Sequence, residues 1–419
     1  MNRRVAITGI GVVSPVGHGK EAFFANLMAA KSGIRQLNAP FIARLKNSAC
    51  GQIVDFNTAE HFPNNLKASS LDRFSQFALV AAKQALNDSG LPYPQWSDAQ
   101  RERVGVSVGT GLGGAVALEE NYDSLFVKGN DRTAPFTVIK IMNNASGGNI
   151  SLDFGLRGPN ITYSTACASS GLSIGEAYRQ IKHGYADVMV AGGAEALLTL
   201  GTIKAWEALR TLAPADASDV GASCRPFSKD RAGLVLGEGS GMLVLEEMEA
   251  AKARGARIYG ELAGYGTSAD ASHITKPDAG GQARAMRIAL DDAQAQAGIA
   301  LSDVGHINAH GTATQVGDVE ETKAIKAVFG EHAKAIAVTS TKSMHGHLMG
   351  ATGAVEFIAA VLALYHQAVP PTANLRVPDP ECDLDYVPNV GRPNVALQAV
   401  MSNSFAFGGS NAVLVAAKL

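Results

Sequence analysis

Short apolar runs rich in β-branched residues alternate along the chain with segments of helical periodicity. Such runs, separated by helical segments, are typical of strands that helices cover on both faces. The predicted strands are residues 4–9, 104–109, 188–192, 241–246, 258–264, 336–339 and 412–416. The alternation therefore predicts an α/β fold built around buried strands.

Three segments predict long helices, at residues 71–87, 281–297 and 351–366. In the first, apolar residues recur every three to four positions, which places them on one face of a helix. A serine at position 69 or 70 is expected to cap its start, and Gly90 is expected to end it.

A charged stretch at residues 249–257, "EAAKARGAR", separates two predicted strands. We expect it to divide the chain into an N-terminal half, residues 1–252, and a C-terminal half, residues 253–419. No strict repeat relates the halves, so periodicity alone does not establish a duplication.

Composition excludes several classes of protein. The 419 residues are 46% hydrophobic, which is enough for a large core, and the net charge of −2 argues against a nucleic-acid partner. There is no apolar run of about 18 residues or more, so no membrane span is expected. Two glycine clusters, "ITGIGVVS" and "GTGLGG", lack the rest of a dinucleotide fingerprint and are interpreted as turns.

The four cysteines are far apart and form no C-x-x-C pair, which argues against a disulfide framework and a structural zinc site; they are Cys50, Cys167, Cys224 and Cys382. A reducing, cytoplasmic location fits this usage of cysteine.

Cys167 lies in "STACASSG", between a strand-like run and a helical pattern. At a helix N-terminus the free N–H groups favour thiolate, so Cys167 is either a nucleophile or a small buried residue.

Histidines in two later glycine-rich segments favour the interpretation of Cys167 as a nucleophile. His310 follows a predicted strand in "INAHGTATQVGD", and Lys342, His345 and His347 lie between a strand and a helix in "TSTKSMHGHLMGA". A metal site formed by the three histidines is conceivable, but no acidic residue completes it, so no metal is predicted. The loop in "SNSFAFGGSN" can supply backbone N–H groups to an oxyanion.

Taken together, segments spread over nearly the whole chain resemble the elongating β-ketoacyl-acyl-carrier-protein synthases of the thiolase superfamily, type II-like branch. The matching segments are "RVAITGIGVVSPVG", "GLRGPNITYSTACASS", "VMVAGGAEA", "RPFSKDRAGLVLGEGSGMLVLE", "NAHGTATQVGD", "KSMHGHLMGATGAVE" and "SNSFAFGGSN". The resemblance implies a thiolase-like five-layered αβαβα sandwich built from two similar halves, and usually a homodimer.

The resemblance also implies the roles of the site residues. Cys167 becomes the acyl-accepting nucleophile, His310 and His347 handle the malonyl thioester, and Lys342 supports them. The N–H groups of Cys167 and Phe407 form the oxyanion hole. Further matching positions are Thr312 and Thr314 on the phosphopantetheine tunnel, Leu112 at the floor of the acyl pocket, Phe405 in substrate binding, and Glu356 as a structural acid near the site.

The implied activity is decarboxylative Claisen condensation of an enzyme-bound acyl group with malonyl-acyl-carrier protein, in fatty acid synthesis. Acyl carrier protein is the expected partner, its phosphopantetheine carries the substrates, and no other cofactor is expected. A basic rim would meet this acidic partner, and Lys67, Arg73, Arg132 and Arg210 are the residues expected to form it.

Alternatives are a ketosynthase of a polyketide or polyene pathway, and a non-catalytic ketosynthase partner subunit. A thiolase would need a second catalytic cysteine, and a cysteine hydrolase offers no role for two histidines and a lysine. Two departures from the family pattern leave loop gating open: Ala406 stands where glycine is common, and His345 where threonine is common.

Overall fold

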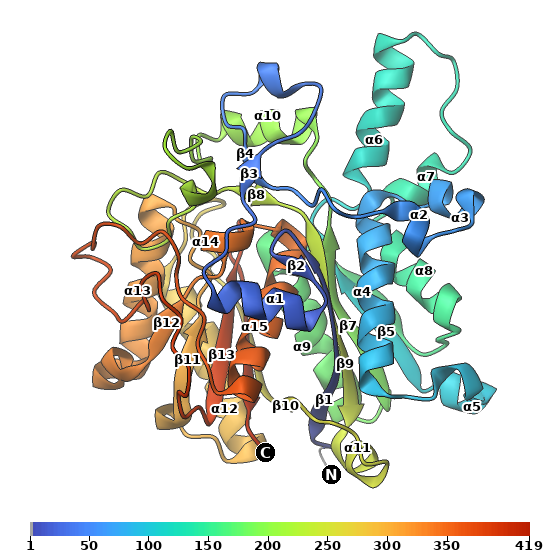
Figure 1. Ribbon diagram of the computed structural model, residues 1–419. Coiled ribbons are helices and arrows are strands. Elements are labelled where there is room, and N and C mark those ends of the chain that lie inside the picture. The colour runs from blue at the N-terminus through green and yellow to red at the C-terminus, as the bar shows by residue number, and fades with distance from the viewer. Residues whose placement is uncertain (1–2) are drawn as a thin grey trace.

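The computed structural model describes residues 3–419. Two sets of five strands make up its main sheet, to which the short β2 is added. Figure 1 shows helices around these strands. The first set comprises β1 (Val5–Ser14), β5 (Val104–Gly109), β6 (Asn160–Tyr163), β7 (Val188–Glu195) and β9 (Gly239–Glu247). The second comprises β10 (Gly260–Ala269), β11 (Val304–Asn308), β12 (Ala337–Thr339), β13 (Ala399–Phe405) and β14 (Ser410–Ala417).

The two sets have the same topology. The first runs β1-β9-β7-β5-β6 across the sheet, and the second runs β10-β14-β13-β11-β12. In each set the first two neighbour pairs are antiparallel and the last two are parallel. The sets join where β1 pairs briefly with β10. The prediction of two similar halves is therefore confirmed by strand order and direction.

Helices form three layers around these strands. The outer helices α4 (Arg73–Ser89) and α8 (Ala145–Phe154) pack on the first set, and α12 (Ala279–Ala297) and α13 (Gln315–Phe329) cover the second (Figure 1). Between the two sets lie α9 (Ser169–Lys182) and α15 (Thr352–His366), which contact each other and strands of both sets. The five-layered αβαβα sandwich is therefore confirmed.

The long helices agree closely with the predicted segments, except at the start of the first. Asp72, not a serine, caps α4, because its carboxylate accepts the Phe74 N–H. Ser69 and Ser70 instead belong to the preceding short helix. Gly90 ends α4 in a left-handed conformation with φ of 67°, as expected.

The central helix α15 explains an ambiguity in the hydropathy. Residues Met349–His366 are long and apolar enough to cross a membrane by length and composition, but 89% of this window is buried inside the protein. A helix enclosed between two sheets must be apolar on every side. Its hydropathy therefore reflects its place in the core.

The remaining elements lie around this sandwich. The short strands are β2 (Gly17–His18), β3 (Arg35–Gln36), β4 (Ala49–Gly51) and β8 (Leu236–Gly237). The other helices are α1 (Lys20–Met28), α2 (Thr58–His61), α3 (Asn65–Ser70), α5 (Asp98–Arg101), α6 (Ala115–Tyr122), α7 (Thr137–Ile141), α10 (Leu200–Ala208), α11 (Met248–Ala253) and α14 (Lys342–His345). The charged stretch between the halves forms α11 and the loop to β10, so the boundary at residues 252/253 stays a prediction within this connection.

Candidate active site

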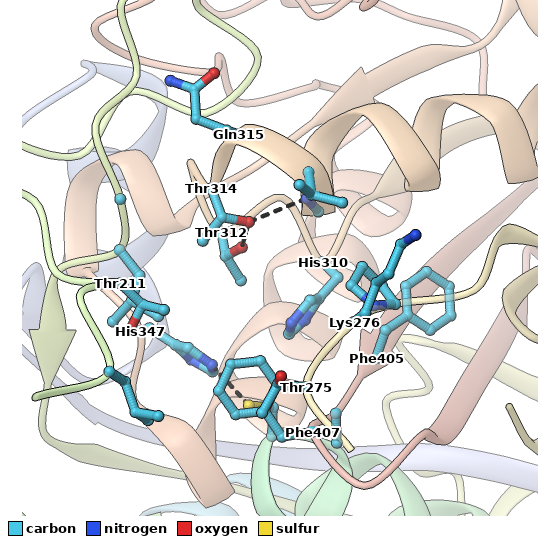
Figure 2. Close-up of a pocket in the computed structure, with 18 of the residues that line it drawn as sticks. Thr211, Thr275, Lys276, His310, Thr312, Thr314, Gln315, His347, Phe405 and Phe407 are labelled. Atoms are coloured by element: carbon cyan, nitrogen blue, oxygen red, sulfur yellow. Dashed lines mark hydrogen bonds between the residues drawn. The ribbon is translucent and has the colours of Figure 1, made fainter. Parts of the chain in front are cut away.

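A cavity of about 420 Å³ brings together residues from both halves of the chain. Cys167 from the first half and His310, His347, Phe405 and Phe407 from the second all line it. Figure 2 shows the rings of His310 and His347 directed into the same space, with Phe407 beside them. The segments that the sequence singled out therefore converge on one site.

Cys167 lies on a sharp elbow between β6 and α9. It belongs to a single 3-10 turn, Ala166–Ala168, and α9 begins at Ser169. Ala166 adopts a positive φ of 48°, an uncommon conformation for alanine that marks local strain. The predicted strand–turn–helix placement of Cys167 is correct, and its side chain is only 5% exposed.

The sulfur of Cys167 faces several hydrogen-bond donors. His347 Nε2 lies 2.9 Å from Sγ, and the backbone N–H of Phe407 also points to the sulfur. Burial nevertheless raises the pKa of the Cys167 thiol to about 11, against the opposing effects of Lys342 and these N–H groups. The backbone N–H groups of Cys167 and Phe407 favour thiolate, as expected for this position, but desolvation outweighs their effect on the pKa.

The surroundings of His347 determine which ring nitrogen carries the proton. The Met349 N–H donates to Nδ1 at 3.3 Å, so Nδ1 must act as an acceptor. The Thr352 hydroxyl, 2.9 Å from Nδ1, can donate to the same nitrogen. In the neutral ring the proton therefore lies on Nε2, which faces Cys167. This tautomer makes His347 a hydrogen-bond donor toward the cavity.

His310 is held through its backbone by a buried acid. The Glu321 carboxylate accepts the N–H groups of His310 and Gly311 at 2.8 and 2.7 Å, and Asn403 donates to the same carboxylate at 3.0 Å. The rings of His310 and His347 meet edge to face, with centroids 5.5 Å apart. Two imidazoles thus border one small volume above the sulfur.

Both histidines are neutral in this environment. Burial lowers the pKa of His310 and of His347 well below the ordinary value, and the Lys342 ammonium lowers both further. The support that the resemblance implies for Lys342 therefore includes disfavouring protonated histidine.

Lys342 forms a fully buried ion pair with Glu356. Its ammonium lies 2.7 Å from both carboxylate oxygens, and both side chains are 0% exposed. The ammonium also donates to the backbone carbonyl of His310. Glu356, on α15, therefore anchors the cation that both orients the His310 loop and keeps the histidines neutral.

Breaking this pair is expected to destabilise the fold. Glu356→Ala leaves an uncompensated buried ammonium, and we expect a loss of about 3–5 kcal/mol in the free energy of unfolding. Urea denaturation measures it. Glu331→Ala, which removes the exposed partner of Lys334, is the control and should leave the midpoint unchanged. Equal midpoints for both variants would contradict the proposed importance of the buried pair.

His345 lies beside the site but has no open nitrogen. Its Nδ1 is 2.7 Å from the Gly346 carbonyl, its Nε2 is 3.0 Å from the Thr341 hydroxyl, and burial lowers its pKa to about 3. These hydrogen bonds hold the turn before His347. Because both ring nitrogens of His345 are occupied, the three histidines do not form a metal site. Within residues 3–419, the atoms that cluster within 4.8 Å are those of Cys167, His310 and His347, without a carboxylate.

The predicted substrate residues are only partly gathered around the cavity. Thr312, Thr314 and Phe405 line it, and the two threonine hydroxyls lie 3.1 Å apart. Leu112 does not line it and is 47% exposed. The Leu112 backbone is held elsewhere, because its N–H and that of Gly111 donate to the buried Glu195.

The loop with the unusual alanine has an ordinary conformation at that residue. Positive φ angles of 85° and 76° occur at Gly408 and Gly409, whereas Ala406 has no positive φ. Alanine at position 406 is therefore compatible with this form of the loop.

Two residues of the predicted basic rim form ion pairs within the fold. Lys67 is paired with Asp153, and Arg73 donates to Glu238 and to the Ile53 carbonyl. Arg210 does line the cavity, and Lys276, which sequence reasoning missed, lines it as well (Figure 2). Arg132 is exposed but is not part of the cavity lining.

Comparison with protein families places the whole chain in one group. Residues 2–251 match the family model described as beta-ketoacyl synthase, N-terminal domain, and residues 259–376 match that for the C-terminal domain. The chain is 44% identical over 416 residues to 3-oxoacyl-[acyl-carrier-protein] synthase 2 of Staphylococcus aureus, covering 99% of this chain and 98% of that protein. It is 43% identical over 417 residues to the protein of the same name from Synechocystis, covering 98% and 97%.

Solved structures with the same fold include several ketosynthases. A type II polyketide ketosynthase in complex with its acyl-carrier protein superimposes with a TM-score of 0.90 at 34% identity, and both chains are covered fully. The ishigamide ketosynthase/chain length factor gives a TM-score of 0.90 at 35% identity, again over the full length of both chains.

Proposed function

The chain belongs to the β-ketoacyl synthase family, and we propose that it condenses a Cys167-bound acyl group with malonyl-acyl-carrier protein, releasing CO₂ and forming 3-oxoacyl-acyl-carrier protein in fatty acid synthesis. One observation carries this proposal: a buried cysteine and two neutral histidines border a single cavity. A cysteine can hold the acyl group, and neutral imidazoles can donate hydrogen bonds to an enolate.

The first half-reaction loads the acyl group. The Cys167 sulfur attacks the carbonyl carbon of the acyl thioester, and the carbonyl oxygen gains negative charge. The N–H groups of Cys167 and Phe407, both close to the sulfur, would stabilise that oxygen. The tetrahedral intermediate collapses by expelling the carrier thiolate, which takes up the thiol proton and leaves.

The second half-reaction begins with loss of CO₂ from the malonyl group. The electron pair of the broken carbon–carbon bond moves into an enolate, and the charge develops on the thioester oxygen. His347 Nε2–H and the His310 ring face the space where that oxygen would lie. Because both rings are neutral, they stabilise the enolate by donating hydrogen bonds without delivering a proton prematurely.

Carbon–carbon bond formation completes the cycle. The enolate carbon attacks the acyl carbonyl on Cys167, and the oxyanion again lies against the two backbone N–H groups. The Cys167 thiolate is then expelled and takes up a proton from water, which restores the thiol. The product is a 3-oxoacyl thioester, two carbons longer, on the carrier. Phosphopantetheine of the carrier holds the substrates, and no step requires a further cofactor.

Fatty acid synthesis is favoured over a polyketide pathway by the degree of identity. The chain is 43–44% identical to the 3-oxoacyl-[acyl-carrier-protein] synthases but 34–35% identical to the polyketide-type structures. The non-catalytic subunit is disfavoured because Cys167, His310 and His347 are all present and assembled.

Mass spectrometry of the purified protein tests the function directly. Incubation with acyl carrier proteins of varied acyl length should add one acyl group to the peptide that contains Cys167, and malonyl-carrier protein should then convert it to 3-oxoacyl-carrier protein. Acylation followed only by hydrolysis to the free acid would overturn the proposal.

Carrier docking is expected to depend on Arg210 and Lys276. Both are exposed and line the cavity, and acyl carrier proteins are acidic. Charge reversal of both residues to glutamate should raise KM for carrier-bound substrate by about ten-fold or more. Lys334→Glu, an exposed lysine outside the cavity lining, should not.

A small thioester reacts without a carrier protein, so it shows whether the charge reversal affects docking or the chemical step. Acylation by a short N-acetylcysteamine thioester should be equal in the wild type and the Arg210→Glu/Lys276→Glu variant. An equal loss with both substrates would show that the two residues do not act through docking.

A homodimer and a cytoplasmic location complete the proposal. Exposed apolar side chains gather on α6, the helical turn after it, and α7; they are Tyr122, Phe126, Val127, Val138, Ile139 and Met142. β6 lies at the end of the strand order, so its outer edge is open to a second copy. The molecular mass from light scattering tests the dimer, and Ile139→Glu should lower that mass.

Four unpaired cysteines support a reducing location.

A further inference from the structure

The oxyanion donor Phe407 lies on a tight turn between β13 and β14. The Ala406 N–H donates to the Ser410 carbonyl at 2.9 Å, and the Gly409 N–H donates back to the Ala406 carbonyl at 3.0 Å. The next two residues are glycines with positive φ, which have more backbone freedom than other residues. Phe407 therefore needs a partner outside the turn if its N–H is to remain aimed at Cys167.

Trp206 supplies that contact. The rings of Trp206 and Phe407 are stacked, with centroids 5.8 Å apart and planes inclined by 24°. Both rings line the cavity, and Trp206 is only 9% exposed. Stacked aromatic pairs stabilise one another beyond their buried area, which favours a single position of a glycine-rich turn.

The helix that carries Trp206 is itself fixed. The Glu119 carboxylate on α6 accepts the N–H groups of Leu200 and Gly201 at 2.7 and 2.6 Å, at the start of α10. The Thr199 side chain caps the same helix. The stack therefore connects the glycine turn to α10, a helix of the N-terminal half whose first turn is held by hydrogen bonds.

Phe407 also packs against the main hydrophobic core, and two further backbone hydrogen bonds of the turn involve a more exposed loop. The Gly408 N–H donates to the Ile274 carbonyl at 2.7 Å, and the Asp270 N–H donates to the Gly409 carbonyl at 2.9 Å. Ile274 is 70% exposed, so this loop is a weaker anchor than α10. Neither bond involves Phe407 itself, whereas the Trp206 stack does.

We propose that Trp206 is a positioning residue that holds Phe407 so that its N–H faces the Cys167 sulfur and the oxyanion formed there. The proposal rests on the condensation chemistry proposed above. Trp206 then serves the two steps that pass through a tetrahedral oxyanion, acyl transfer to Cys167 and carbon–carbon bond formation. It does not serve decarboxylation, whose charge develops against His310 and His347.

The first test compares these steps in Trp206→Ala. The rate constant for acylation at saturating carrier should fall about ten-fold, part of the ~10²–10³ that a lost oxyanion donor costs, with KM nearly unchanged. Malonyl decarboxylation, measured in a Cys167→Ala background, should change less than two-fold on adding Trp206→Ala. Trp206→Phe, which keeps a stackable ring, should recover most of the acylation rate.

A double-mutant cycle sharpens the assignment. Phe407→Ala removes the stacked ring but keeps the backbone N–H, so it should slow acylation as much as Trp206→Ala, and the double variant should lose no more than either alone. Additive losses would overturn the proposal, because Trp206 would then act independently of Phe407. An equal loss of decarboxylation would also overturn it.

Fluorescence gives a readout independent of activity. The chain has two tryptophans, so Trp96→Phe leaves Trp206 as the single emitter. Phe407→Ala in that background should shift the emission of Trp206, and unchanged emission would show that the stack is not formed. If the unmutated enzyme forms no acyl-enzyme at all, the proposed function fails, but the emission test still decides whether the stack exists.

Discussion

Cys167→Ala is expected to abolish acyl-enzyme formation and condensation, while malonyl-carrier decarboxylation persists. The acyl group needs a side chain that can form a reactive thioester, and within residues 3–419 Cys167 is the only cysteine that lines the cavity. The enolate donors, His310 and His347, remain in place in this variant. Intact-protein mass and CO₂ release measure the two activities separately.

The other cysteines provide matched controls. Cys50, Cys224 and Cys382 are buried, and none of them lines the cavity. Cys224→Ala should therefore still accept one acyl group, on Cys167. Acyl mass retained in Cys167→Ala would contradict the assignment of the nucleophile.

This result also separates the enzyme from its rivals. A thiolase would carry a second catalytic cysteine in the loop that contains Phe407, and no cysteine is present there. A Cys–His hydrolase would require His347 Nε2 to accept the thiol proton. The Met349 N–H bond to Nδ1 instead places a proton on Nε2, so the ring is set up as a donor.

Much of the architecture was predictable because it depends on local patterns. Apolar runs and helical periodicity located most of the strands and the three long helices. The similarity of the halves was not visible in periodicity, because it lies in the order and direction of the strands and not in repeated residues. The five-layered arrangement came from the resemblance to a family and was then confirmed by the packing.

The reactive residues of the site were also recognisable, but their supports were not. Cys167 and the histidines stand at ends of predicted strands, next to small residues. Glu321 accepts the backbone N–H groups of His310 and Gly311, and Glu195 accepts those of Gly111 and Gly350, which are far from it in the sequence. Nothing in the sequence around either glutamate indicates which loop it holds. The Trp206–Phe407 stack joins residues from the two halves, so only the fold reveals it.

The surroundings of the surface charges were not predictable from the sequence for a similar reason. Arg73 is basic in the sequence, but its guanidinium forms a bidentate pair with Glu238 in the fold. Long-range ion pairing of this kind decides whether a charge is available to a partner, and it depends on residues far apart in the chain. Lys276 was missed for the converse reason, because only the folding of its loop places it at the cavity.

Because the two histidines are neutral, we expect the rate of decarboxylation to stay constant as the pH falls below neutrality. Their pKa values are lowered, so each ring stays neutral until the pH falls through that lower value. An ordinary histidine would be about half protonated near pH 6.5. Decarboxylation by Cys167→Ala should therefore stay constant from about pH 8 to about pH 6. A loss with a midpoint near pH 6.5 would contradict neutral donors.

His310→Ala and His347→Ala are expected to slow decarboxylation and to retain acylation of Cys167. This is the reverse of the result expected for Cys167→Ala. Each removes a preorganised donor to the enolate oxygen, so decarboxylation should fall by ~100-fold or more. Acylation of Cys167 should remain appreciable, because its oxyanion lies against the N–H groups of Cys167 and Phe407, not against the imidazoles. Single-turnover acylation and CO₂ release, measured on the same samples, give the two rates.

His345→Thr is the matched control for these two variants, since His345 is buried close to His347 but has both nitrogens occupied by Thr341 and Gly346. Decarboxylation in this variant should fall far less than in His347→Ala, because no donor to the enolate is removed. A hydrolase with a histidine base would behave differently: its acylation would stop first when the base is lost. Complete loss of acylation in both His310→Ala and His347→Ala, with circular dichroism unchanged, would therefore replace the enolate assignment with a Cys–His dyad.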